Sequence, residues 1–312
     1  MVMKEFNIEL HKNTKWENPF SACIGYFDGL HLGHQELMRI TKQDALKKNI
    51  KSALMTFDPD PWITLKIKND IKHLTPLVLR KRLAREFGID YWITLRFTEE
   101  MSQLSPEAFI ELLNTIPLSS LICGFDFNYG KKGKGNIETL KAAIKNFELI
   151  TVPPIVFKGA KISTTRICTL LEEGKVLEAN QLLGYPFQMT GTVIHGKHLG
   201  STIGFPTANL SYSNEFLLPK EGVYIGTAIV ENIAYMAMIN IGRNPTVEQR
   251  SSISIEVHIL DFNKDIYEKE LSIAFHNRIR DIIKFASIND LVRQLEVDCI
   301  STKEYFSYNS IM

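Results

Sequence analysis

The chain has few cysteines, and none of them lie close together in the sequence. Cys23, Cys123, Cys168 and Cys299 are scattered over 312 residues, and no CxxC pattern occurs. This distribution excludes a disulfide framework and a zinc site built from thiolates. We therefore expect a reduced, soluble protein of the cytoplasm.

Long apolar runs and an excess of one charge are also missing. No apolar run reaches the roughly 20 residues that span a bilayer, and the N-terminal sequence MVMKEFNIEL has no stretch typical of a secretory signal. The formal net charge is +1, which gives no basis for broad attraction to nucleic acid or anionic membranes. The short basic stretch 131–134 is typical of a solvated loop. We expect small-molecule partners and neither a membrane nor a nucleic acid; the sequence leaves the oligomeric state open.

The first 185 residues alternate short apolar runs with longer helix-like stretches. Strands are expected at 22–26, 52–57, 91–95, 119–123 and 149–152, and helices at 35–49, 77–87, 106–114 and 137–146. This alternation is typical of βαβ units on a parallel sheet. Two further helices are expected at 164–173 and 176–183, separated by Gly174 as a stop signal.

The pattern changes after Gly184. Short strand-like runs separated by Gly, Pro and Asn are expected to form strands at 190–195, 223–230, 234–241, 252–260 and 271–275, before a final helix at about 288–300. Short strands at this spacing predict a small antiparallel β-barrel. The domain boundary is expected near 185–189, giving domains 1–185 and 186–312. In the run 253–259 isoleucine and valine alternate with polar residues, so Glu256 points away from the apolar face.

The string GYFDGLHLGH, from Gly25 to His34, follows an expected strand and precedes an expected helix. Its glycines, among them Gly33, permit tight turns, and the helix start offers free N–H groups to an anion. His31 and His34 are three residues apart and can both donate hydrogen bonds to phosphate oxygens. The alternatives are a glycine-rich turn with two surface histidines, or a zinc site, for which no third and fourth ligand stand at a useful spacing.

The string GTVIHGKHLGSTIGFPTANL, residues 191–210, is the second strong motif. Gly196 and Gly204 can form a flap that brings backbone N–H groups to phosphates. Thr207 and Asn209 offer oxygen ligands of the kind that Mg²⁺ prefers. Taken alone, the residues PTAN are also compatible with an ordinary turn.

At the first string the chain resembles the prokaryotic bifunctional riboflavin kinase/FMN adenylyltransferases, also called FAD synthetases. The string GFDFNYG (124–130) is similar to the family's flavin- and nucleotide-binding motif, and ISTTRI (162–167) to its ATP-phosphate motif. The resemblance implies a Rossmann-like nucleotidyltransferase domain in which His31 and His34 are catalytic. It further implies ATP or phosphate binding by Gly25, Phe27, Asp28, Gly33, Ser163, Thr164 and Arg166, and flavin binding by Asp126, Phe127 and Asn128.

Two departures from the family pattern remove positive charge. Asp60 stands in FDPDP where the family has a histidine, and Cys168 stands where it has an arginine. Charge-assisted contacts to phosphate contribute about 1.5–3 kcal/mol each. We therefore expect FMN adenylylation to rise when Asp60→His and Cys168→Arg restore the family residues.

The second string resembles the riboflavin kinase motif that ends in GFPTANL, and GVY (222–224) and NIGRNPT (240–246) extend the similarity. The resemblance implies that Gly196, Gly204 and Thr207 bind ATP, that Thr207 and Asn209 hold Mg²⁺, and that Glu256 is the general base. Arg280 is expected either to orient the flavin or a phosphate, or to form a structural ion pair.

The implied function is FAD biosynthesis. Riboflavin is phosphorylated to FMN with ATP and Mg²⁺, and FMN is then adenylylated to FAD with release of pyrophosphate. Two alternatives stay open at this point. One is a monofunctional riboflavin kinase with an impaired adenylyltransferase module, and the other is a flavin- or RNA-binding regulator.

Overall fold

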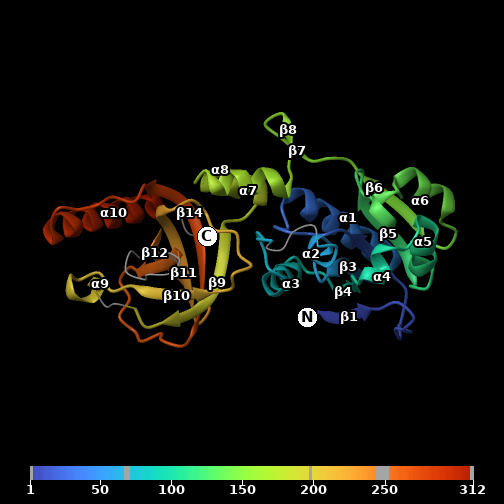
Figure 1. Ribbon diagram of the computed structural model, residues 1–312, viewed down its shortest axis with the longest axis horizontal. Coiled ribbons are helices and arrows are strands. Elements are labelled where there is room, and N and C mark those ends of the chain that lie inside the picture. Colours follow the sequence, from blue (N-terminus) through green and yellow to red (C-terminus); the bar gives the residue numbers. More distant parts are fainter. Residues whose placement is uncertain (1–2, 67–70, 197–198, 244–252, 310–312) are drawn as a thin grey trace. The chain divides into compact units, whose positions relative to one another are not determined.

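A computed structural model describes residues 3–66, 71–196, 199–243 and 253–309. The chain forms two compact units, Met1–Thr164 and Thr165–Met312 (Figure 1). No helix within the described ranges combines the length and the apolar character needed to cross a membrane.

The first unit is built on a six-stranded sheet in the order β1-β4-β3-β2-β5-β6, and all its neighbouring strands are parallel. The strands are β1 Lys4–Ile8, β2 Phe20–Ile24, β3 Lys51–Asp58, β4 Tyr91–Arg96, β5 Leu118–Gly124 and β6 Glu148–Val152. The predicted parallel sheet is confirmed. Strand β1 was not predicted, because its sequence KEFNI is half polar and it lies at the sheet edge, where only one neighbour covers it.

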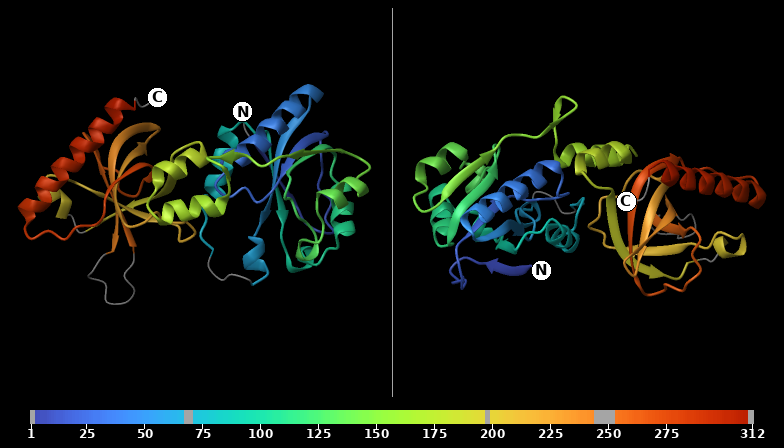
Figure 2. Two further views of the ribbon diagram at one scale, coloured as in Figure 1. Left: turned by 90° about the horizontal axis from the view of Figure 1, so that it is seen from above. Right: turned by 180° about the vertical axis from the view of Figure 1, so that it is seen from behind.

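Helices cover both faces of this sheet (Figures 1 and 2). They are α1 Leu32–Lys48, α2 Pro61–Thr64, α3 Leu77–Glu86, α4 Glu99–Ser102, α5 Pro106–Asn114 and α6 Ile137–Ala143, with a 3₁₀ turn at Lys131–Gly133 and a short hairpin of β7 Val156–Phe157 and β8 Ala160–Lys161. Helix α1 packs on β2, β3 and β5. Helices α5 and α6 pack on the opposite face, where their buried side chains join Phe20, Ala22 and Ile24 in one apolar core.

Strand β2, which is followed by α1, lies in the middle of the sheet. From β2 the chain continues to β3 on one side, and later returns to β5 on the other. In open parallel sheets such a reversal leaves a crevice at the carboxyl ends of the strands, where ligands bind. The glycine-rich string follows the end of β2 and GFDFNYG follows the end of β5, so both predicted motifs flank this position.

The second unit begins with α7 Thr164–Glu172, whose first residue closes the first unit, and α8 Val176–Leu183. It continues as a closed barrel of six strands in the order β10-β13-β12-β11-β14-β9. The remaining elements are β9 Phe187–Ile194, α9 Leu199–Thr202, β10 Ala208–Tyr212, β11 Gly222–Val230, β12 Ile233–Arg243, β13 Ile253–Ile259, β14 Glu270–Arg280 and α10 Ile288–Tyr308. All neighbouring strands are antiparallel, which confirms the predicted small barrel.

The barrel core consists of alternate residues along each strand. Ile255, Val257 and Ile259 of β13 are buried, whereas Glu256 between them is partly exposed on the outer face. Helix α10 packs on β11 and β12 and lies along the outside of the barrel (Figure 2). It extends to Tyr308, beyond the expected end near residue 300.

Candidate functional site

The glycine-rich string forms a tight loop between β2 and α1. Phe27, Gly29 and Leu30 have φ values of 58°, 80° and 35°, a left-handed conformation that side-chain-bearing residues rarely adopt. His31 is the N-cap of α1, and its Nδ1 accepts a hydrogen bond from the backbone N–H of His34 at 3.3 Å. Because Nδ1 is an acceptor, the proton of this imidazole lies on Nε2.

Both histidines at the start of α1 are held in the neutral form. Burial lowers the pKa of His31 to about 4, and burial, reinforced by His31, lowers the pKa of His34 well below its ordinary value. The two rings stack with centroids 3.7 Å apart. Within the described residues, the buried Nδ1 of His34 has no hydrogen-bond partner. A buried polar atom without a partner is costly, so a ligand group here would remove a penalty.

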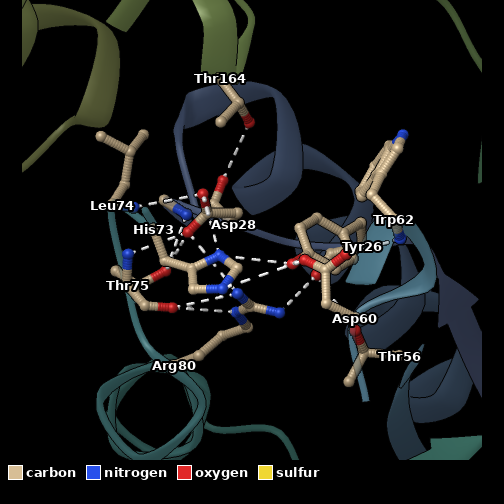
Figure 3. Close-up of polar contacts among 11 residues, drawn as sticks. Tyr26, Asp28, Thr56, Asp60, Trp62, His73, Leu74, Thr75, Arg80 and Thr164 are labelled. Atoms are coloured by element: carbon tan, nitrogen blue, oxygen red, sulfur yellow. Dashed lines mark hydrogen bonds and ion pairs between the residues drawn. The ribbon is translucent and has the colours of Figure 1, made fainter. Parts of the chain in front are cut away.

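The carboxylate of Asp28 braces the loop against the segment that leads into α3 (Figure 3). It accepts hydrogen bonds from the backbone N–H groups of Leu74 at 3.2 Å and Thr75 at 2.9 Å. The Thr75 hydroxyl donates to it at 3.1 Å, and Arg80 lies 3.6 Å away. The side chain is therefore occupied within the protein. The contact of Asp28 with ATP stays a prediction. Because the carboxylate is already hydrogen-bonded, we expect the backbone of Asp28 to make this contact.

The ISTTRI segment reaches the same loop. The Thr164 hydroxyl donates to the backbone oxygen of Asp28 at 3.1 Å (Figure 3), so two predicted phosphate-binding motifs separated by more than a hundred residues meet. Ser163 precedes Thr164 directly. Arg166 belongs to α7 in the second unit.

The predicted flavin-binding residues of the first unit follow β5. The Asp126 carboxylate forms an ion pair with Lys161, in which both side chains are about half exposed. The Asn128 amide donates to the backbone oxygen of Asp126 at 2.8 Å. Phe127 stacks on Tyr129 with centroids 5.9 Å apart. The aromatic ring is thus anchored to the core, while the polar groups at the carboxyl end of β5 stay accessible to a ligand.

Asp60 occupies a different environment from the one that the sequence suggests. It is 8% exposed, it is the N-cap of α2, and its Oδ1 accepts from the backbone N–H of Trp62 at 2.8 Å. The Tyr26 hydroxyl donates to its Oδ2, as Figure 3 shows. The carboxylate is therefore enclosed in a hydrogen-bonded cluster. A histidine at this position would replace a buried acceptor, and we no longer expect it simply to add a free positive charge at the phosphates.

In the second unit, strand register brings the predicted kinase residues together. Asn209 on β10 lies directly opposite Glu256 on β13, and Asn240 on β12 lies opposite Glu256 on the other side. Directly opposed residues of antiparallel strands share a face, with Cβ atoms about 4.5–5.5 Å apart. Asn209, Glu256 and Asn240 therefore form a row across the outer face of the barrel. Thr207 lies just before β10.

Two glycines of the GTVIHGKHLGSTIGFPTANL string pack closely on Asn209 or on Thr207, the residues expected to hold Mg²⁺. A Cβ at Gly196 would lie 2.0 Å from Nδ2 of Asn209, and one at Gly200 would lie 2.3 Å from the backbone oxygen of Phe205 and 3.3 Å from Oγ1 of Thr207. Gly204 has a φ of 85°. A side chain at position 196 would displace the Asn209 amide, one at position 200 would collide with backbone, and one at position 204 would be strained by the positive φ. Residues 197–198 of this string and 244–246 of NIGRNPT lie outside the described residues.

Arg280 forms an ion pair with Asp298, and a structural ion pair was one of the two roles expected for it. Its guanidinium donates to the fully buried carboxylate of Asp298 on α10, with Nη2 to Oδ2 at 2.7 Å and Nε to Oδ2 at 3.0 Å. Gln294 adds a third donor to Asp298 at 3.0 Å. Contact of Arg280 with flavin stays a prediction.

Sequence reasoning gave no role to Tyr26, His73 or Asn240, which the structure places beside predicted site residues. Tyr26 belongs to the string GYFDGLHLGH and Asn240 to NIGRNPT, so membership in these motifs could have indicated that both residues lie near the sites. His73 lies outside every motif, and only the fold brings it to Tyr26, 47 residues earlier.

Comparison with known proteins assigns a family to each unit. A riboflavin kinase family model matches residues 183–306, and an FAD synthetase family model matches residues 13–166. Curated relatives named bifunctional riboflavin kinase/FMN adenylyltransferase include one from Listeria monocytogenes, 41% identical over 91% of this chain and 92% of its own. Another, from Bacillus subtilis, is 38% identical over 91% and 92%.

A solved structure from Streptococcus pneumoniae, named a macrolide-efflux protein, matches with a TM-score of 0.89 at 33% identity. The match covers 96% of this chain and 99% of that one. It thus extends over both the parallel sheet and the barrel.

Proposed function

Because the chain belongs to the family of bifunctional riboflavin kinase/FMN adenylyltransferases, we propose that its two parts catalyse the two consecutive steps that make FAD. Residues 186–312 phosphorylate riboflavin with ATP, and residues 1–185 transfer AMP from ATP to FMN with release of pyrophosphate. The FAD synthetase match ends at residue 166 and the kinase match begins at residue 183, which supports a division near residue 185. A monofunctional kinase or a binding regulator is not favoured, because both family models match. A cytoplasmic location is supported by the four scattered cysteines.

The kinase step is carried by the direct pairing of Asn209 with Glu256. Glu256 accepts the proton of the ribityl 5′-hydroxyl as that oxygen attacks the γ-phosphorus of ATP, and the bond to the β-phosphate oxygen breaks. Asn209, one strand away, is close enough to hold the phosphate end of ATP beside this base. The products are FMN and ADP.

Mg²⁺ fits the donor set beside Glu256. Thr207 and Asn209 offer a hydroxyl and an amide oxygen, and the glycines packed on them leave backbone in place of side chains. Among the residues described, no group of three or more His, Cys, Asp or Glu side chains could hold a metal ion. Mg²⁺ keeps several waters and binds few protein oxygens together with substrate phosphates, so one hydroxyl and one amide oxygen are a sufficient contribution from the protein. Bound there, the ion would neutralise charge on the phosphates.

The adenylyl transfer step uses positioned donors and needs no covalent nucleophile. An oxygen of the FMN phosphate attacks the α-phosphorus of ATP, and the bond to pyrophosphate breaks. Nε2–H of His31, an N–H of His34 and backbone N–H groups at the start of α1 stabilise the charge that develops. Ser163 and Thr164 contact the phosphates of ATP, and Asp126, Phe127 and Asn128 contact the flavin nucleotide.

Separate assays of the two steps test this assignment. Glu256→Gln should lower FMN formation from riboflavin by about 10²–10⁴-fold, while FAD formation from supplied FMN stays at the wild-type rate. Ser254→Ala is the matched control, because Ser254 is two residues away on the same face of β13. A Glu256→Gln protein that keeps a third of the wild-type kinase rate would disprove the role of Glu256.

A further inference from the structure

Tyr26, Asp60 and His73 form a polar cluster, here called the corner cluster, where three separate segments of the first unit meet (Figure 3). Tyr26 belongs to the glycine-rich loop, Asp60 to the turn between β3 and α2, and His73 to the segment before α3. Asp60 and His73 are each 8% exposed. Buried polar groups require partners, and these three provide them to one another.

The direction of each hydrogen bond in the corner cluster follows from chemistry. Burial and the neighbouring Asp60 carboxylate raise the pKa of Tyr26, so its hydroxyl keeps its proton and donates it to Asp60. A phenol has a single proton, and Nδ1 of His73 lies 3.3 Å from the same oxygen. His73 must therefore donate Nδ1–H to Tyr26. The result is a relay of donors from His73 through Tyr26 to Asp60.

Two carboxylates lie close to the His73 ring, and one cation lies beside one of them. Nε2 of His73 lies 3.9 Å from Asp60, and Nδ1 lies 3.9 Å from Asp28. Arg80 lies 3.6 Å from the Asp28 carboxylate, and its guanidinium carbon lies 4.8 Å from the Tyr26 ring centre. The His73 imidazole thus lies between two carboxylates, one of which is paired with Arg80.

The corner cluster connects to the proposed phosphate site through the backbone of the loop. The backbone oxygen of Tyr26 accepts from Arg80 at 2.8 Å and from Thr56 at 3.0 Å. The next residue, Phe27, is the left-handed residue whose ring packs edge-on against His34, with centroids 5.2 Å apart. A shift of Tyr26 would therefore move Phe27 and the imidazole of His34.

We propose that His73 is a positioning residue for adenylyl transfer, which acts with Asp60 through the Tyr26 hydroxyl to hold the loop and His34 in place. This inference rests on the proposed adenylyltransferase function of the first unit.

Kinetics of FAD formation from FMN at varied ATP test this role, with the full-length protein and the variants His73→Leu, Tyr26→Phe and the double variant. Loss of one buried hydrogen bond corresponds to about a tenfold fall in kcat/KM for ATP. We expect that fall in each single variant, and KM for FMN within about twofold of wild type. Because both substitutions break the same relay, the double variant should be no worse than the more affected single variant. His73→Gln, which keeps an N–H donor, should recover part of the activity.

Riboflavin phosphorylation by the same proteins and the fluorescence of the unit's tryptophans verify that each variant is folded. His11→Leu is the matched control, since the His11 side chain is 78% exposed. A wild-type protein that makes no FAD overturns the proposed function together with this inference. If the wild-type protein makes FAD, the inference alone is overturned in either of two cases. Folded His73→Leu keeps the wild-type kcat/KM for ATP, or the effects of His73→Leu and Tyr26→Phe multiply.

Discussion

Acidification should destabilise the first unit through His31. Burial lowers the pKa of this imidazole from its ordinary 6.5 to about 4 in the folded protein, and its Nδ1 is needed without a proton to cap α1. Between pH 4 and pH 6.5 the imidazole of residue 31 is therefore protonated more often in the unfolded chain than in the folded chain. The contribution of neutral His31 to the free energy of unfolding is complete above pH 6.5, and it is lost as the pH falls towards 4.

The size of the effect follows from the pKa difference. Each unit of pKa corresponds to about 1.4 kcal/mol, so the difference limits the loss to about 3 kcal/mol once both states are protonated. Between pH 7 and pH 5 linkage gives a loss of about 2 kcal/mol in the free energy of unfolding. That is a substantial share of the roughly 5–15 kcal/mol by which native domains are stable.

The chain offers a selective probe for this measurement. All three tryptophans, Trp16, Trp62 and Trp92, lie in the first unit, so tryptophan fluorescence during urea unfolding follows that unit alone. His31→Asn keeps a good N-cap without a titrating ring, and His11→Asn is the exposed-histidine control. The stability difference between wild type and His31→Asn should change by about 2 kcal/mol from pH 7 to pH 5. A difference that stays constant over this range would refute the reasoning.

Three further predictions concern single side chains. Asp298→Ala removes the fully buried acceptor of the partly buried Arg280 guanidinium, so the urea midpoint for loss of kinase activity should fall by the equivalent of about 1.5–3 kcal/mol, with the tryptophan midpoint unchanged; an unaltered kinase midpoint would show that the pair is not structural. Asn209→Ala should raise the Mg²⁺ and ATP needed for FMN formation much more than it weakens riboflavin binding measured by flavin fluorescence, whereas equal losses would indicate collapse of the pocket. Asp60→His removes the cap of α2, worth about 0.5–2 kcal/mol, and the acceptor of Tyr26, so FAD formation from FMN should fall; a rise would favour the expectation from sequence alone.

Much of the fold was predictable because its elements carry strong local signals. Helix α5 begins with Ser105 as its cap and Pro106 as its first residue, and the alternation around Glu256 marks β13 with its buried face. The edge strand β1 lacked such a signal. Strand β10 was missed because Ala208–Tyr212 overlaps the PTAN residues, which are also common in turns.

The candidate site was predictable only where its residues share a motif. His31 caps α1 and His34 lies in its first turn, three positions later, so their stacking follows from helix geometry. The corner cluster depends on residues 26, 60 and 73, which no periodicity connects. The environment of Asp60 was likewise beyond the sequence, because its exposure and its Tyr26 partner are set by the packing of three segments.

The central claim is that one chain performs both steps of FAD formation. Its most direct test is a single incubation of the wild-type protein with riboflavin, ATP and Mg²⁺, followed by chromatographic separation of riboflavin, FMN and FAD over time. The account predicts that FMN appears first and that FAD follows with release of pyrophosphate. FMN that accumulates without any FAD would contradict the assignment of the first unit, and riboflavin that stays unchanged would contradict the assignment of both.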